Sequence, residues 1–366
     1  MDPADPTTWP RSARRFHGAR CPPPRSSPLL EVLLRRIRAE GPLSFDAFME
    51  AALYHPEHGY YRQPRSPLGP AGDYVTAPEH HPAFGRLVGR RLRQVWEGLG
   101  HPARFTVVEQ GAGSGALAEG VLAELEEAQV RYRVIEPFAS WRSRQAARLA
   151  RRAAQVEWVE SVQECPSFTG VFVSNELVDA FPAHRVVVRR GALRELWVAA
   201  GDGVLVEEEG PLSTPGLRCA FDRAGLLPLE GVRAAVCLRL EPWAEAVCAR
   251  IERGSFLTID YGGTAAELYG TTGRADVRAC RRHLPAELLA APGEQDLTAP
   301  VDFTALIRAG KRAGLTLSAF TTQRDFLLAM GWEKWRARAG VSRRALTDLI
   351  DPRLMGGARV VELERP

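Results

Sequence analysis

An acidic residue and three closely spaced glycines follow a short apolar run, and together they suggest a ligand site. They are Glu109, Gly111, Gly113 and Gly115. Because glycine has no Cβ, the backbone can turn tightly after a strand and approach a ligand closely. The helix predicted directly after the turn offers free backbone N–H groups at its start. This combination predicts that a small molecule binds where the strand ends.

A second acidic residue narrows the class of ligand. Glu136 ends the next apolar run, about twenty residues after the last glycine, where a carboxylate binds the ribose hydroxyls in doubly wound nucleotide sites. The sequence therefore predicts a cofactor that contains adenosine.

The choice of cofactor depends on Glu109. The glycines can be aligned with the dinucleotide fingerprint G-x-G-x-x-G/A, with Ala116 as its last position. However, a carboxylate directly before the turn would repel a pyrophosphate, whereas it can accept hydrogen bonds from the amino group of S-adenosyl-L-methionine. We therefore expect S-adenosyl-L-methionine. A nicotinamide dinucleotide and a glycine turn without a ligand are the alternatives.

Acidic residues also close two later apolar runs. Asn175, Glu176 and Asp179 follow the run at 171–173, and Asp260 ends another run before a Tyr-Gly-Gly turn. Because the carboxyl ends of parallel strands meet at one edge of a sheet, these side chains predict a polar cleft that binds charged ligands. For Asp179 alone, a helix N-cap is the alternative.

Composition excludes several classes of protein. The 366 residues are 45% apolar and 25% charged, with a formal net charge of +4, which is ordinary for a globular domain. Basic and acidic residues are intermixed, so nucleic acid is not an expected partner. No apolar run is long enough for a membrane span, and the cysteines lack zinc-ligand spacing, so no metal is expected. Free thiols and the lack of a secretory leader predict a cytoplasmic protein.

The alternation of helical and strand patterns predicts an α/β fold with a mostly parallel sheet. We expect a loose N-terminal extension (1–28), a helical front with a cofactor-covering loop (29–100), and a Rossmann-like domain (101–366) with an insertion at about 183–250. The predicted strands are 105–109, 132–136, 156–160, 171–175, 255–260, 315–321 and 358–363, the predicted hairpin of the insertion is 185–189 with 193–198, and the main helices are 29–39, 83–98, 116–128, 138–152 and 241–252.

Several motifs together indicate a family. They are Gly41-Pro-Leu-Ser-Phe45, Tyr54-His-Pro-Glu-His-Gly-Tyr-Tyr61, Gly72-Asp73-Tyr-Val-Thr76-Ala-Pro78-Glu79, the glycine turn, Asn175-Glu176-Leu-Val-Asp179-Ala-Phe-Pro182, Asp260-Tyr261-Gly262 and Val301-Asp302-Phe303. Over about residues 28–363 the chain resembles the MidA-type family of S-adenosylmethionine-dependent methyltransferases. The resemblance implies a class I methyltransferase fold: a seven-stranded sheet with an N-terminal helical extension and an insertion between strands 4 and 5.

The resemblance also implies roles for individual residues. Gly72 and Asp73, on the loop from the helical front, are expected to close over the cofactor. Asn175, Glu176 and Asp179 are expected to face the methyl acceptor, with Glu176 orienting or deprotonating the nucleophile.

The family leaves the acceptor open. Its best-understood member methylates an arginine of a partner protein, so we expect N-methylation of a guanidino or similar group on a protein, peptide or small molecule. The alternatives are O- or N-methylation of a biosynthetic small molecule, and a non-catalytic assembly factor on the same fold; a homodimer is also left open. The chain departs from the family at Pro300, where a histidine is usual, and proline can neither titrate nor donate a hydrogen bond.

Overall fold

The fold is described from a computed structural model, which covers residues 27–366 except for positions 64, 66, 70, 271–274 and 338–342. Of the expected loose extension, residues 1–26 lie outside this description. The largest element is a seven-stranded sheet, as predicted. In sheet order its strands are β16 (Thr316–Thr322), β17 (Arg359–Arg365), β10 (Ile251–Asp260), β5 (Phe168–Asn175), β2 (Thr106–Gln110), β3 (Arg131–Ile135) and β4 (Val156–Val159).

The order of these strands creates a place for a ligand. The five strands from β4 to β10 run parallel, and β17 is antiparallel to β10. The chain passes from β2 outward through β3 to β4 and then returns to β5, on the other side of β2. In such sheets ligands bind at the carboxyl ends of the strands where the order reverses. Here that point lies between β2 and β5.

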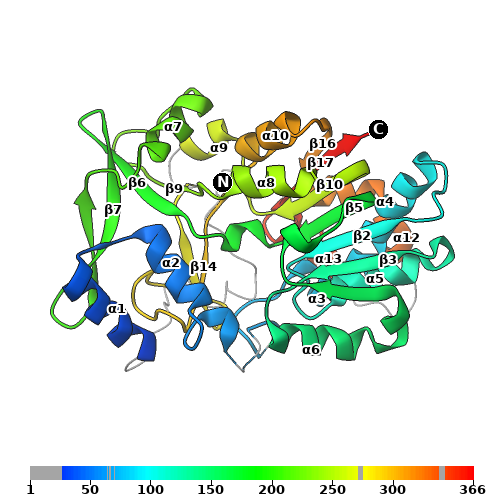
Figure 1. Cartoon of the computed structure of the whole chain (residues 1–366), viewed down its shortest axis with the longest axis horizontal. Coiled ribbons are helices and arrows are strands. Elements are labelled where there is room, and N and C mark those ends of the chain that lie inside the picture. The colour runs from blue at the N-terminus through cyan, green and yellow to red at the C-terminus, as the bar shows by residue number, and fades with distance from the viewer. Residues whose placement is uncertain (1–26, 64, 66, 70, 271–274, 338–342) are drawn as a thin grey trace.

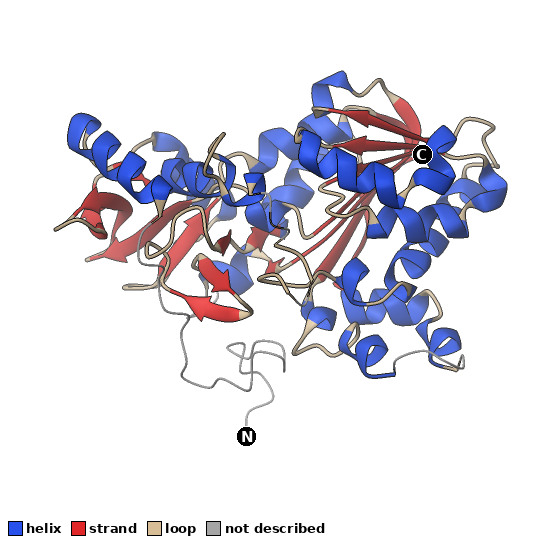
Figure 2. Ribbon diagram, turned by 90° about the horizontal axis from the view of Figure 1, so that it is seen from below, coloured by secondary structure: helices blue, strands red, loops and turns tan. Residues whose placement is uncertain are grey.

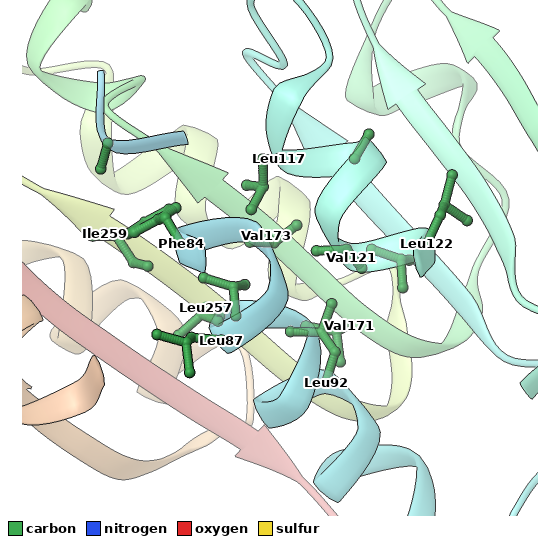
Figure 3. Packing of buried hydrophobic residues seen from close by; sticks show 14 of the residues in the cluster. Phe84, Leu87, Leu92, Leu117, Val121, Leu122, Val171, Val173, Leu257 and Ile259 are labelled. Carbon is green, nitrogen blue, oxygen red and sulfur yellow. The ribbon is translucent and has the colours of Figure 1, made fainter. Parts of the chain in front are cut away.

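Helices cover both faces of this sheet (Figure 2). One face packs on α4 (Ala83–Gly98) and α5 (Ala116–Glu124), and the other on α8 (Leu240–Cys248) and α10 (Phe303–Arg312). Successive side chains of a strand point to opposite faces, so Val171 and Val173 join the first core (Figure 3) and Phe172 joins the second.

The prediction of a helix over 241–252 is wrong at its C-terminal end, because residues from Ile251 onward already belong to β10. The helix predicted over 116–128 continues beyond α5 as a short 3₁₀ helix.

The helical front and the insertion form a second lobe, at the left of Figure 1. The front contributes α1 (Pro28–Glu40), β1 (Leu43–Ser44) and α2 (Phe45–Tyr54), and the insertion contributes β6 (His184–Arg189), β7 (Ala192–Ala200), β8 (Leu205–Gly210), α7 (Pro215–Ala224) and β9 (Arg233–Val236). β6 and β7 pair as the predicted hairpin. β1 also pairs with β7, with Leu43 opposite Val198, so one sheet contains both segments. The division at residue 100 stays a prediction.

Several smaller elements complete the two lobes. They are the 3₁₀ helices η2 (Tyr60–Arg62) and η6 (Val178–Ala180), the sheet of β12 (Arg278–Arg281), β13 (Leu284–Ala286) and β14 (Asp296–Thr298), the pair β11 (Gly262–Gly263) and β15 (Val301–Asp302), and the helices α3 (Ala77–His80), α6 (Ala139–Arg148), α9 (Ala265–Tyr269), α11 (Gln323–Ala329), α12 (Trp332–Arg336) and α13 (Arg343–Asp348). The strands β12 to β14 were not predicted, because runs this short carry little periodicity.

Candidate functional site

A cavity of about 580 Å³ lies at the carboxyl ends of β2, β3 and β5. This volume is within the range of small-molecule sites. The glycine turn and Glu136 line one half, which we call the cofactor half. Glu50, Tyr54, Tyr61 and Glu176 line the other, the acceptor half. The site therefore forms where the strand order reverses.

The glycine turn shapes the cofactor half. Gly111 has φ +76°, and a Cβ there would lie 2.8 Å from Leu177 Cδ1. Gly113 has φ +51°, and its Cβ would lie 3.2 Å from Leu68 Cδ1. A side chain at either position would be strained and crowded. Gly115 does not line the cavity; it is the N-cap of α5 with φ +88°.

Glu136 is buried at the end of β3 and lines the cavity. One carboxylate oxygen accepts a hydrogen bond from the Phe138 backbone N–H (3.1 Å), and the other accepts one from the Gln145 side-chain amide (3.1 Å). The same amide donates to the Gly113 carbonyl oxygen (3.0 Å). Gln145 thus fixes the glycine turn and Glu136 relative to each other. Burial raises the pKa of Glu136 above its ordinary value.

Glu109 lies within β2 and is buried beneath the glycine turn. Its carboxylate accepts a hydrogen bond from the Tyr132 hydroxyl (2.6 Å) and also lines the cavity. Burial raises its pKa to about 7, and the bond from Tyr132 opposes part of this rise. A cationic ligand nearby would favour the charged carboxylate.

Glu176 lines the acceptor half and has an unusual backbone conformation. It follows β5 with φ +48°, in the left-handed region, where a non-glycine residue costs about 1–2 kcal/mol. Its carboxylate accepts hydrogen bonds from the Asn175 side-chain amide (3.1 Å) and the Ala77 backbone N–H (3.0 Å). Burial raises the pKa of Glu176 to about 7, and the charges of Asp260 and Asp296 add to the rise. Strained residues of this kind are concentrated at functional sites.

A cluster of four carboxyl groups lies around this half: the half-buried Glu176 and the buried Asp179, Asp260 and Asp296. Burial and mutual repulsion raise the pKa of Asp179 well above its ordinary value. In the part of the chain that the structure describes, none of the four forms an ion pair with a basic side chain. The Asn175 side-chain oxygen is also buried and accepts no hydrogen bond from any residue that the structure describes. Among the described residues, the acids of the acceptor half therefore outnumber the basic groups that could neutralise them.

Asp179 does not line the cavity itself. It lies within η6, whose N-cap is Leu177, so it is not the N-cap that was the alternative. Asp260 has a structural contact, because its carboxylate accepts hydrogen bonds from the backbone N–H groups of Leu177 (3.1 Å) and Val178 (2.8 Å).

Gly72 and Asp73 lie beside the site and do not line the cavity. The Asp73 carboxylate is fully buried and accepts hydrogen bonds from the Tyr60 hydroxyl (3.0 Å), Arg65 (2.6 Å) and the Arg282 backbone N–H (2.8 Å). These bonds tie the front loop to β12. The loop reaches the cavity instead through Leu68, Tyr74 and Thr76. Direct contact of Gly72 and Asp73 with the cofactor stays a prediction.

Sequence reasoning did not select Tyr54, Glu79 and Gln145, although all three contribute to the site. Tyr54 and Glu79 line the cavity, and Glu79 accepts hydrogen bonds from the Ser114 hydroxyl of the glycine turn and from Arg148 (3.2 Å). Both belong to motifs that carried the family resemblance, which was a usable signal. Gln145 is a polar residue within a helix, and no pattern distinguished it.

The residues present fit S-adenosyl-L-methionine. Gly111 and Gly113 form a tight turn in the cavity wall that a side chain would strain, Glu136 offers acceptors for hydroxyl groups, and Glu109 and Glu176 offer acidic groups for cations. Among the described residues, no group of three or more His, Cys, Asp or Glu side chains could hold a metal ion. No described helix is long and apolar enough to cross a membrane. The fold and the site together define an S-adenosylmethionine-dependent methyltransferase of class I.

Comparison with known families supports the assignment to the methyltransferases. A family model described as "Putative S-adenosyl-L-methionine-dependent methyltransferase" matches residues 87–321, and the chain belongs to this family. A crystal structure from Burkholderia thailandensis, described as a "likely methyl transferase" bound to S-adenosyl-homocysteine, is 29% identical with a TM-score of 0.84 and covers 94% of this chain and 95% of that one. The predicted fold class, activity and cofactor are confirmed.

Curated relatives give a more specific likeness. A chain from Xenopus tropicalis, named protein arginine methyltransferase NDUFAF7, mitochondrial, is 28% identical over 83% of this chain and 75% of its own length. A homologue of the same name from Drosophila melanogaster is 29% identical over 75% of this chain and 68% of its own length. The predicted cytoplasmic location is contradicted, because these relatives are named as mitochondrial. Cysteine spacing and the pattern of the first residues were weak grounds for a compartment, since thiols stay reduced in several compartments.

Proposed function

We propose that this methyltransferase N-methylates the guanidinium group of an arginine side chain in a protein. The observation that carries this proposal is the acidic cluster of the acceptor half, where Glu176, Asp179, Asp260 and Asp296 have no basic partner among the described residues. A guanidinium is always charged and presents five N–H donors in a rigid fork. It would supply the missing charge and the missing donor for Asn175. The names of the curated relatives support the same acceptor.

The cofactor half supports the binding of S-adenosyl-L-methionine. In this proposal Glu136 accepts hydrogen bonds from the ribose hydroxyls, as carboxylates do at this position of nucleotide sites. Gly111 and Gly113 pack beside the adenosine and methionine portions. Glu109 accepts hydrogen bonds from the cofactor amino group, directly or through water. When bound, the cofactor supplies an electrophilic methyl group on its sulfonium sulfur.

The acceptor half then has to orient and deprotonate the guanidinium. Loss of this proton is costly, because the guanidinium pKa is above about 12. Glu176, with a pKa of about 7, accepts the proton as the new N–C bond forms. The nearby Asp179 and Asp296 carboxyl groups stabilise positive charge on the acceptor. Asn175 fixes the orientation of the Glu176 carboxylate through their hydrogen bond of 3.1 Å.

The test uses the purified protein, S-adenosyl-L-methionine with a labelled methyl group, and capped peptides Gly-Gly-X-Gly-Gly in which X is arginine, lysine or citrulline. Citrulline keeps the shape of arginine and removes its charge. We expect label only in the arginine peptide, recovered as methylarginine after hydrolysis. Label on lysine, or binding of the cofactor without transfer to any arginine probe, would contradict the arginine assignment and leave the cofactor site intact.

A further inference from the structure

An exposed ion pair lies in the wall of the acceptor half. Glu50, on α2 of the helical front, pairs with Arg239, which directly precedes α8 on the other lobe. Both residues line the cavity. Their side chains are 45% and 52% exposed, so the pair lies where the cavity opens to solvent. The pair therefore joins the two lobes across the mouth of the acceptor half.

Aromatic rings lead inward from this mouth. Tyr54 follows Glu50 by four residues on α2, so both side chains lie on the same side of the helix. The Tyr54 ring lies 5.5 Å from that of Tyr61 and 6.5 Å from that of Phe138. The Tyr61 hydroxyl donates to Asp296 (2.9 Å), one of the four acids of the cluster. A path of polar and aromatic groups therefore leads from the mouth to the interior: first Glu50, then the rings of Tyr54 and Tyr61, and then Asp296.

The chemistry of this path suits a guanidinium. An exposed ion pair contributes only about 0–1 kcal/mol, so Arg239 can be displaced from Glu50 at little cost. Aromatic faces attract cations, and arginine more often than lysine occupies such positions. Burial and the charges of Asp296, Glu50 and Asp179 raise the pKa of Tyr54, so its ring stays neutral. Its hydroxyl is already bound, because it donates to the Ala180 carbonyl oxygen (2.9 Å).

We propose that Glu50 and Arg239 form an entry gate: the arginine of the acceptor replaces Arg239 on Glu50 and then passes along Tyr54 and Tyr61 toward Glu176. In this role Arg239 occupies the site of the incoming side chain and competes with it. The gate rests on the proposed arginine acceptor and adds a residue that attracts the acceptor, Glu50, and a residue that competes with it for Glu50, Arg239.

If the pair is a gate, substitution of Glu50 and substitution of Arg239 should change the affinity for the peptide in opposite directions. If the pair only joins the lobes, the two substitutions should not have opposite effects. Binding of the capped Gly-Gly-Arg-Gly-Gly peptide is measured by calorimetry with the protein saturated with S-adenosyl-homocysteine. We expect Arg239→Gln to bind the peptide up to about fivefold more tightly, and Glu50→Gln about fivefold more weakly. The matched controls are Arg36→Gln and Glu40→Gln, because Arg36 and Glu40 form a pair on α1 with similar exposure, 45% and 59%, away from the cavity.

Each outcome distinguishes an entry gate from an ion pair that only joins the two lobes. Opposite shifts in the pair, with unchanged affinity in the controls and unchanged S-adenosyl-homocysteine affinity throughout, support the gate. Shifts in the same direction, or none, mean that the pair only joins the lobes, and they overturn the gate while the arginine acceptor stands. If the parent protein binds S-adenosyl-homocysteine and no arginine peptide, both the gate and the proposed acceptor are wrong.

Discussion

The two halves of the cavity differ in how completely the protein satisfies its own polar groups. In the cofactor half, Glu109 and Glu136 each accept hydrogen bonds from neighbouring protein groups, so the half is fixed before any ligand arrives. In the acceptor half, Glu176 also accepts two hydrogen bonds, but it lies among Asp179, Asp260 and Asp296, and among the described residues none of these four acids has a basic partner and the Asn175 side-chain oxygen accepts no hydrogen bond. The comparison indicates that the cofactor half is a preformed site. In the acceptor half, the proposed cationic substrate would neutralise the negative charge of the acids.

The largest expected effect separates the halves at Glu176. Glu176→Gln keeps the shape of the side chain and removes its charge, so turnover should fall by about 10²-fold or more, the usual scale for a lost general base. Affinity for S-adenosyl-L-methionine should stay close to that of the parent protein. Steady-state kinetics with an arginine acceptor and calorimetry of the cofactor measure the two effects. Turnover at the parent rate would show that Glu176 is structural.

The second prediction concerns Glu136, in the cofactor half. Glu136→Ala removes a charged acceptor, so cofactor binding should weaken by about 1–3 kcal/mol, or roughly five- to 150-fold. Glu160→Ala is the matched control, because Glu160 directly follows the adjacent strand β4 and is not among the residues that line the cavity. Equal affinity of a folded Glu136→Ala protein and its control would remove the ribose assignment.

The pH dependence of cofactor binding tests Glu109. With a pKa raised to about 7, its carboxyl group is largely protonated at pH 6 and ionised at pH 8. A cationic cofactor favours the ionised form, so affinity should rise by about tenfold between these values and then level off. Calorimetry across this range should show a much flatter profile for Glu109→Gln. An equally steep profile in the variant would assign the titration to another group, with Glu176 the first candidate because its pKa is also about 7.

The smallest effect concerns the front loop. Asp73→Asn weakens the hydrogen bonds to Tyr60, Arg65 and Arg282, so the loop that carries Leu68 and Tyr74 should be less well positioned. We expect cofactor affinity to fall by roughly twofold to tenfold, less than for Glu136→Ala, and stability to fall by about 1–3 kcal/mol. Thermal unfolding with and without S-adenosyl-homocysteine separates these effects. Cofactor affinity within twofold of the parent would show that the loop position is not needed.

The same two halves explain what could be predicted from the sequence. The glycine turn and Glu136 belong to one strand–helix–strand unit, so their spacing along the chain determines their positions in space. The acceptor half combines α2, the turn after β5 and the residue before α8, which are far apart in the sequence. Glu176 could be found because it ends a strand. Arg239 could not, because an arginine before a helix has no distinguishing pattern, and only tertiary packing brings it opposite Glu50.

Asp73 shows a different limit. Its motif drew attention to a residue that is fully buried, but a motif does not say toward which side a carboxylate points. The structure directs it to Arg282 and Tyr60, away from the cavity.

The pairing of β1 with β7 has a consequence for synthesis of the chain. Leu43 leaves the ribosome long before its partner Val198, and at about 5–20 residues per second the interval is roughly 8–30 s. During this time the apolar faces of α1 and α2, with Leu33 and Phe48, lack the surface that later buries them. The nascent helical front therefore exposes apolar surface until β7 has been made, and truncations that end before β7 should aggregate.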